Sequence, residues 1–163
     1  MHSNAPHIIL IDGRSGVGKT SLSTVLAAKL GATVLHLDDV YPGWGGLAEG
    51  RDVVIDGVLR NIANGRPGRV SGWDWQKGVP GREITVTPAD VVVIEGCGIS
   101  TAEARQLADV VMWVDCPDSE RRERLRRRDG TVFSAHQEEW DEQVIKHIAD
   151  NDPIGTATVT VIT

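Results

Sequence analysis

Short apolar runs alternate along the chain with segments that have helical periodicity. The apolar runs cover residues 8–11, 33–37, 91–94 and 110–114, and a β-branched run covers 156–162. Runs of this length that stop at glycines or acidic residues are typical of buried strands. We therefore expect five strands, most of them buried on both faces.

Between these runs, apolar residues recur every three or four positions, which predicts helices over 20–30, 54–62, 118–128 and 138–150. Ser100 and Glu103 form a capping box for one further short helix. Residues 41–50 and 64–68 are rich in glycine and predict loops. Strands that alternate with helices indicate right-handed βαβ units, a mostly parallel sheet and a three-layer α/β fold. Ligands of such sheets bind beyond the carboxyl ends of the strands.

Composition narrows the class of protein further. The chain has 163 residues, 40% of them hydrophobic, which predicts a single domain over 1–163. Its net charge of −6 argues against nucleic acid or an anionic membrane as partner, while a homo-oligomer stays open. Cys97 and Cys116 lack the spacing of a metal site, and neither a leader nor an apolar run near 18 residues is visible. We expect a soluble, cytoplasmic protein.

The segment after the first apolar run has the spacing of a Walker A phosphate loop. Gly13, Gly18, Lys19 and Thr20 follow the pattern G-x-x-x-x-G-K-T between a predicted strand and a predicted helix. Lys19 would contact the β- and γ-phosphates of ATP, and the Thr20 hydroxyl would bind Mg²⁺. The residues expected to bind the nucleotide are Gly13, Arg14, Ser15, Gly16, Val17, Gly18, Lys19, Thr20 and Ser21.

Other features favour one class of phosphate-loop protein. The chain lacks the N-K-x-D motif of GTPases, and the run 91–94 ends in Glu95 where motor and transporter ATPases carry aspartate. Both observations favour a small-molecule kinase. Asp38 and Asp39 follow the run 33–37, where a carboxylate could orient an acceptor hydroxyl and take its proton. The alternative for these acids is a helix cap or a solvated turn.

Four segments together resemble the uridine kinase family of P-loop kinases, with its relatives the nicotinamide riboside kinases and phosphoribulokinases. They are GRSGVGKTSL at 13–22, LDDVY at 37–41, GWDW with ITVTPADVVVIEG at 72–96, and RRERLRRRD at 121–129. The resemblance spans most of residues 13–129. It departs in two places: Val40 replaces the family's phenylalanine, and the H-P-x-A-F-type segment that holds ribose gives way to the loop PGWGGLAEGRD.

The resemblance implies roles for several residues. Asp38 matches the catalytic aspartate, which also contacts Mg²⁺ through water, and Glu95 matches the glutamate that holds the Mg²⁺ waters. Trp73 and Asp74 match an aromatic–Asp pair near the acceptor pocket, although core packing and substrate stacking are equal readings for Trp73 and Trp75. Residues 72–75 and the loop 41–51, which begins with Tyr41, are expected to shape that pocket.

Six arginines lie within residues 121–129 of an otherwise acidic chain. On a helix Arg121, Arg124 and Arg128 share one face. Six like charges repel, so the run indicates a short lid over about 121–136 that closes on the transferred phosphate. The resemblance places Arg124 and Arg128 in that role. The alternatives are a solvated face paired with nearby acids, or a small nucleic-acid patch.

These observations predict an ATP- and Mg²⁺-dependent kinase that phosphorylates a hydroxyl of a nucleoside or nucleoside-like metabolite. Lys19, Asp38, Arg124 and Arg128 would be its catalytic residues. Two alternatives remain. One is a kinase for another acceptor, such as a nucleoside monophosphate, a sugar acid or a vitamin precursor. The other is an ATP-binding regulatory protein without transfer activity.

Overall fold

A five-stranded parallel sheet forms the centre of the protein within residues 5–163, which the computed structural model describes. The strands lie in the order β2–β5–β1–β6–β7, and neighbouring strands pair in parallel. In chain order they are β1 (His7–Asp12), β2 (Thr33–His36), β5 (Val91–Glu95), β6 (Val110–Asp115) and β7 (Val159–Ile162). Each lies on a predicted run, and the last is shorter than expected.

Both faces of the sheet are covered, which explains why its strands read as continuous apolar runs. Along β1, Ile8 and Leu10 belong to one hydrophobic cluster, whereas Ile9 and Ile11 belong to another. Successive side chains of a strand point to opposite faces, so a strand buried on both faces needs an apolar residue at every position.

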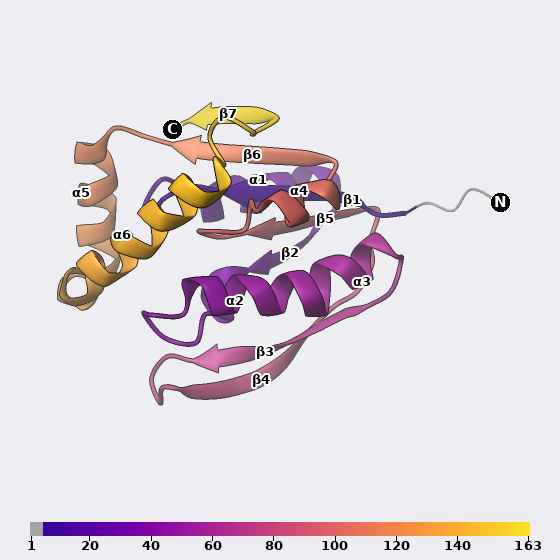
Figure 1. Cartoon of the computed structure of the whole chain (residues 1–163), viewed down its shortest axis with the longest axis horizontal. Helices are drawn as coiled ribbons and strands as arrows, with labels where there is room; N and C mark the ends of the chain where they lie inside the picture. The colour runs from indigo at the N-terminus through magenta and orange to yellow at the C-terminus, as the bar shows by residue number, and fades with distance from the viewer. Residues whose placement is uncertain (1–4) are drawn as a thin grey trace.

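Helix α1 (Lys19–Leu30) covers one face of the sheet through Leu22 and Leu26. The other face is covered by helices whose side chains join the larger cluster. These are α2 (Leu47–Val54), the π-helical turn Ile55–Leu59, α3 (Arg60–Ala63), α4 (Ala102–Gln106) and α6 (Thr131–Asn151). Helix α5 (Asp118–Asp129) stands at the carboxyl end of the strands (Figure 1). The three-layer α/β fold is thus confirmed.

A second, two-stranded antiparallel sheet was not predicted. Its strands β3 (Gly68–Asp74) and β4 (Val79–Val86) run beside α2 and α3 (Figure 1), and β4 also contacts β2 at the edge of the central sheet. Glycines allow this close approach. A Cβ on Gly57 would lie 2.4 Å from the Arg69 carbonyl oxygen, and one on Gly68 would lie 2.6 Å from Val58 Cα.

Several local predictions were wrong in detail. Asp38 lies in a 3₁₀ turn (Leu37–Asp39) beyond β2, because that strand already ends at His36. Helix α2 begins inside the predicted loop 41–50, and α6 begins at Thr131, directly after Gly130 separates it from α5.

The cap of α4 also differs from the prediction. Thr101 Oγ1 accepts a hydrogen bond from the Ala104 amide at 3.1 Å, so Thr101, not Ser100, is the N-cap residue. The Ser100 amide is already bonded to Asp12.

None of the helices in the described part of the chain combines the length and the apolar character needed to cross a bilayer.

Candidate active site

The loop between β1 and α1 packs tightly against the rest of the protein because of its glycines. Gly16 and Gly18 have φ values of +82° and +100°, a region that side chains disfavour. A Cβ on Gly13 would lie 2.4 Å from the Val114 carbonyl oxygen, and one on Gly16 would lie 2.8 Å from Leu125 Cγ. The loop therefore fits between β6 and α5 only with glycine at these positions.

Lys19 folds back over this loop. Its Nζ donates to the Arg14 carbonyl oxygen at 2.9 Å and lies 3.5 Å from Cys97 Sγ. Burial favours the neutral amine, but nearby anionic groups, Glu95 and Asp38 among them, outweigh it and raise the pKa of Lys19. The Lys19 side chain therefore stays protonated, with its ammonium against the phosphate loop.

The other predicted loop residues divide into two groups. Ser15, Gly16, Gly18, Thr20 and Ser21 line a cavity of about 660 Å³ together with Lys19. Gly13, Arg14 and Val17 do not line it: Val17 is fully buried, and Arg14 forms an ion pair with Asp118 at 2.8 Å. Only the backbone of these three could contribute to nucleotide binding.

Glu95 forms the link between the loop and β2. Its buried carboxylate accepts a hydrogen bond from Thr20 Oγ1 at 3.0 Å, and the same oxygen lies 2.6 Å from His36 Nδ1. The hydrogen bond to Glu95 raises the pKa of His36, and burial partly opposes this. His36 therefore holds Glu95 in place, a role that its sequence position did not reveal.

The oxygen atoms at this point suit a hard divalent cation. Within the described residues, no group of three or more His, Cys, Asp and Glu side chains is placed to hold a metal on its own. Mg²⁺ commonly takes only one or two protein ligands and completes its octahedron with phosphates and water. The Thr20 hydroxyl, the Glu95 carboxylate and the nearby Asp38 carboxylate fit that mode of binding.

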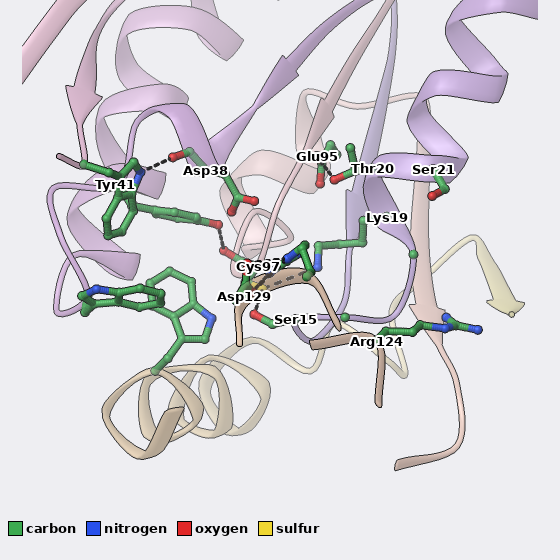
Figure 2. Close-up of a pocket in the computed structure, with 16 residues that line it drawn as sticks. Ser15, Lys19, Thr20, Ser21, Asp38, Tyr41, Glu95, Cys97, Arg124 and Asp129 are labelled. Carbon is green, nitrogen blue, oxygen red and sulfur yellow. Dashed lines mark hydrogen bonds and ion pairs between the residues drawn. The ribbon is translucent and has the colours of Figure 1, made fainter. Parts of the chain in front are cut away.

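Asp38 faces the loop across the cavity. Figure 2 shows its carboxylate turned toward the same space as the Lys19 ammonium and Glu95. The side chain is open to the cavity but closely surrounded by protein, and this partial loss of solvent raises the pKa of Asp38, while the positive charge of Lys19 opposes the rise. The arrangement brings a basic carboxylate to the place where a phosphate chain would end.

The arginines of α5 have different environments. Arg124 and Arg128 line the cavity, and Arg128 is paired with Asp129 at 2.8 Å. Arg121 is buried, donates to the Ser15 carbonyl oxygen at 3.4 Å and pairs with Asp118, so it anchors the loop to the helix. Arg126 and Arg127 pair with Glu123 on the exposed side of the helix, so the solvated-face alternative holds for part of the run.

The cavity continues from the phosphate loop to an aromatic wall. Tyr41 lines it as predicted and donates its hydroxyl proton to the Cys97 carbonyl oxygen at 2.7 Å. Trp44, Trp75 and Trp140 also line it. Trp44 and Trp75 lie in the segments 41–51 and 72–75, which were expected to shape the acceptor pocket, whereas Trp140 was not assigned to it. Their shared role could not be inferred from spacing because they come from a loop, a hairpin turn and a distant helix.

Trp73 and Asp74 lie elsewhere. They line a separate, open hollow beside β3 and β4, and the Asp74 carboxylate accepts hydrogen bonds from the amides of Gln76 and Lys77 in the hairpin turn. The structure therefore does not bring this pair to the cavity that holds Asp38.

A buried network beneath the loop also escaped sequence reasoning. The Asp12 carboxylate accepts hydrogen bonds from the amides of Gly13, Gly98 and Ser100 at 2.7–2.9 Å and lies 2.8 Å from His147 Nε2. It joins the start of the phosphate loop, the segment after β5 and helix α6. An aspartate directly before the first loop glycine is the only signal of this network in the sequence.

Residues 9–144 match a family model described as an AAA domain. The chain belongs to this AAA-domain family. The description names a type of domain and no reaction. No curated protein matches the chain.

Several solved structures that resemble this AAA-domain protein are described as small-molecule kinases. A possible uridine kinase from Bacillus stearothermophilus has a TM-score of 0.71 and 20% identity, with 99% of this chain and 91% of that chain covered. Shikimate kinase from Acinetobacter baumannii, in complex with shikimate, has a TM-score of 0.57 and 19% identity, covering 98% and 85%. A gluconokinase from Sinorhizobium meliloti has a TM-score of 0.55 and 16% identity, covering 97% and 82%.

These likenesses establish the fold of the AAA-domain protein as that of P-loop kinases. The predicted resemblance to that group is confirmed at this level. At identities of 16–20%, they do not carry over a substrate.

Proposed function

We propose that this protein is an ATP-dependent kinase that transfers the γ-phosphoryl group to a hydroxyl of a small, uncharged acceptor with a flat ring, such as a nucleoside or a nucleoside-like metabolite. One observation carries the proposal. A single cavity joins the phosphate loop, with Lys19 at its mouth, to the Asp38 carboxylate and then to an aromatic wall.

The phosphate half of this cavity has the parts that phosphoryl transfer requires. Lys19 and the loop amides would hold the β- and γ-phosphates, and Arg124 and Arg128 would neutralise charge on the transferred group. Mg²⁺, when bound by Thr20 with Glu95 and Asp38 nearby, would neutralise further phosphate charge. Arg121 supports this half indirectly because it ties α5 to the loop.

Asp38 would act on the acceptor. Its carboxylate accepts a hydrogen bond from the acceptor hydroxyl and orients the oxygen toward the γ-phosphorus. As the new O–P bond forms and the bond between the γ-phosphorus and the bridging oxygen breaks, the hydroxyl proton passes to Asp38 and ADP leaves. The raised pKa of this group makes it a better proton acceptor than an ordinary aspartate.

The acceptor half favours an uncharged molecule. Among the described residues, the basic side chains that line the cavity are those of Lys19, Arg124 and Arg128, on the phosphate loop and on α5, and the aromatic wall as described carries none. Anionic acceptors such as a nucleoside monophosphate or a sugar acid need cationic partners of their own. The lack of a basic residue at the aromatic wall therefore favours a nucleoside-like acceptor over a nucleoside monophosphate or a sugar acid.

Asp38→Asn tests the proposal. We expect the affinity for a fluorescent ATP analogue to stay within a few-fold, because the loop is untouched, and turnover measured as ADP release to fall by about 100-fold or more. Asp39→Asn is the matched control, since Asp39 lines the hollow beside β3 and β4 and not this cavity. It should keep full activity.

The acceptor is sought by measuring ADP release with nucleosides, nucleoside monophosphates, sugar acids and vitamin precursors in parallel. Release stimulated only by an anionic acceptor would refute the nucleoside-like assignment. Tight ATP binding with no stimulated release by any of them would instead favour the regulatory, non-transferring protein.

A further inference from the structure

Three of the five tryptophans of the chain meet at the aromatic wall. We call Trp44, Trp75 and Trp140 the tryptophan corner. The ring centroids of Trp44 and Trp75 are 5.1 Å apart with planes inclined at 59°, and those of Trp44 and Trp140 are 6.2 Å apart at 90°. Tyr41 meets Trp140 edge to face at 4.8 Å. Tyr41 and Trp140 are almost fully buried, so the ring surface open to a ligand at this end of the cavity belongs mainly to Trp44 and Trp75.

The corner is held in shape before any ligand enters. Gln143 on α6 donates from Nε2 to the Trp44 carbonyl oxygen at 2.7 Å and accepts at Oε1 from the Leu47 amide at 3.1 Å. The His136 ring stacks on Trp44 with the centroids 4.9 Å apart and the planes at 6°. Two residues of α6 therefore fix the glycine-rich loop that carries Trp44.

The corner is also tied to the proposed catalytic group. Trp75 Nε1 donates to the backbone carbonyl oxygen of Asp38 at 2.8 Å. A ring that lies against Trp75 therefore lies beside the residue whose carboxylate would orient the hydroxyl, and both residues line the same cavity. This arrangement suits an acceptor in which the hydroxyl is carried close to the ring.

Few groups at the corner could read the edge of a base. Amide side chains are missing from the residues described as lining the cavity, and the aliphatic hydroxyls among them, Ser15, Thr20 and Ser21, belong to the phosphate loop and α1. The Asp129 carboxylate also lines the cavity, but it is paired with Arg128 at 2.8 Å. The Tyr41 hydroxyl and the Trp75 indole N–H are already donated to backbone carbonyls. The Trp140 indole N–H has no partner but also has no exposed surface, so a ligand in the cavity does not reach it.

From these observations we infer that the tryptophan corner binds the acceptor ring by its faces and does not discriminate between base edges. The inference rests on the proposed function, because it concerns the acceptor of that reaction. Every nucleobase has a π face, so stacking tolerates different bases, whereas a saturated ring has no π face of its own and stacks less favourably on an indole. The enzyme should therefore select flat rings over saturated ones and be indifferent to their hydrogen-bonding pattern.

Binding of uridine, cytidine, adenosine, inosine and 5,6-dihydrouridine, measured by calorimetry with Mg²⁺ and a non-hydrolysable ATP analogue present, tests this inference. We expect the dissociation constants of the four flat nucleosides to agree within about tenfold, and dihydrouridine to bind about tenfold or more weakly than uridine. A preference above 100-fold for one base, equal binding of uridine and dihydrouridine, or no binding of any nucleoside would overturn it.

A pair of variants separates the ring face from the hydrogen bond that the indole makes. Trp75→Phe and Trp75→Leu both lose the N–H donated to Asp38, but only the phenylalanine keeps an aromatic face. Trp75→Leu should weaken the binding of all four flat nucleosides by the same factor, about 5- to 150-fold. Trp75→Phe should keep most of the affinity. Trp73→Leu, in the other hollow, should change nothing. Equal losses in the two Trp75 variants would contradict stacking.

The assay for the proposed function is separate. If nucleosides bind as described but ADP release is never stimulated, the transfer proposal fails and the ring subsite stands. If release is stimulated with strict choice of one base, the kinase stands and the inference about the tryptophan corner fails.

Discussion

Replacing the Asp12 carboxylate by an amide should destabilise the protein strongly, although Asp12 touches no part of the cavity. Each of its oxygens accepts two hydrogen bonds: Oδ1 from the amides of Gly13 and Gly98, and Oδ2 from the Ser100 amide and from His147. The Asn151 side-chain amide lies 3.2 Å from His147 Nδ1 and can only donate there, so the imidazole proton is on Nε2 and points to Asp12.

Asp12→Asn turns one of these oxygens into an NH₂ group that faces donors. Whichever way the amide is oriented, at least one buried backbone N–H loses its acceptor, which costs about 1–3 kcal/mol, and the remaining bonds lose the strength that a charged acceptor gives. Asp12 is only 1% exposed, so water cannot replace these partners. We expect the free energy of unfolding to fall by about 3 kcal/mol.

Urea unfolding followed by circular dichroism measures this loss. With a slope of about 2 kcal/mol per molar urea, the midpoint should fall by about 1.5 M. Asp109→Asn is the control: Asp109 also accepts from a backbone amide, that of Ile8, but its side chain is half exposed, so the change should stay below about 1 kcal/mol. A loss below 1 kcal/mol in Asp12→Asn would refute the reasoning.

The central sheet and the phosphate loop could be predicted because their signals are local. Strands β1 and β5 are buried on both faces, and such strands are apolar at nearly every position. The spacing of Gly13, Gly18 and Lys19 is fixed by a turn that begins and ends within a few residues. No distant contact is needed to recognise either pattern.

The hairpin of β3 and β4 could not be predicted because its strands lack a hydrophobic pattern. Most of β4 is exposed, and the buried positions of β3 include Gly68 and Gly72. What places the hairpin is the close approach of Gly57 and Gly68 to backbone across the contact, which no local pattern reveals.

The acceptor side could be predicted only in part, for a related reason. Trp73 lies within β3, whereas Trp75 lies just beyond the end of that strand and donates to the Asp38 carbonyl oxygen. The two tryptophans are only two positions apart in the sequence, yet only Trp75 lines the cavity. Trp44 and Trp140 meet through a long-range contact between the glycine-rich loop and α6. The predicted pocket segments 72–75 and 41–51 contain Trp75 and Trp44, but the sequence pattern did not reveal that Trp73 lines another hollow or that Trp140 joins the cavity.

Two further substitutions test the packing around the phosphate loop. Gly16→Ala should lower ATP affinity by about tenfold or more, because a Cβ there would lie 2.8 Å from Leu125 Cγ and φ is +82°. The control is Gly31→Ala, where φ is +63° but no atom lies within 4 Å of the added Cβ. It should lower the free energy of unfolding by only about 1–2 kcal/mol and leave ATP affinity unchanged. Equal ATP affinity in both variants would show that the loop does not need this close contact. The last prediction concerns Cys97, studied in a Cys116→Ser background. Burial raises the pKa of the Cys97 thiol, although the positive charge of Lys19 partly opposes this, and thiolate is the reactive form. The folded protein should therefore react with Ellman's reagent about tenfold or more slowly than the urea-unfolded chain at pH 8. MgATP should slow the reaction further, because the phosphates draw the Lys19 ammonium from its position 3.5 Å from Cys97 Sγ and cover the thiol. A folded-state rate equal to that of the unfolded chain, or one that MgATP accelerates, would contradict a nucleotide site closed over this thiol.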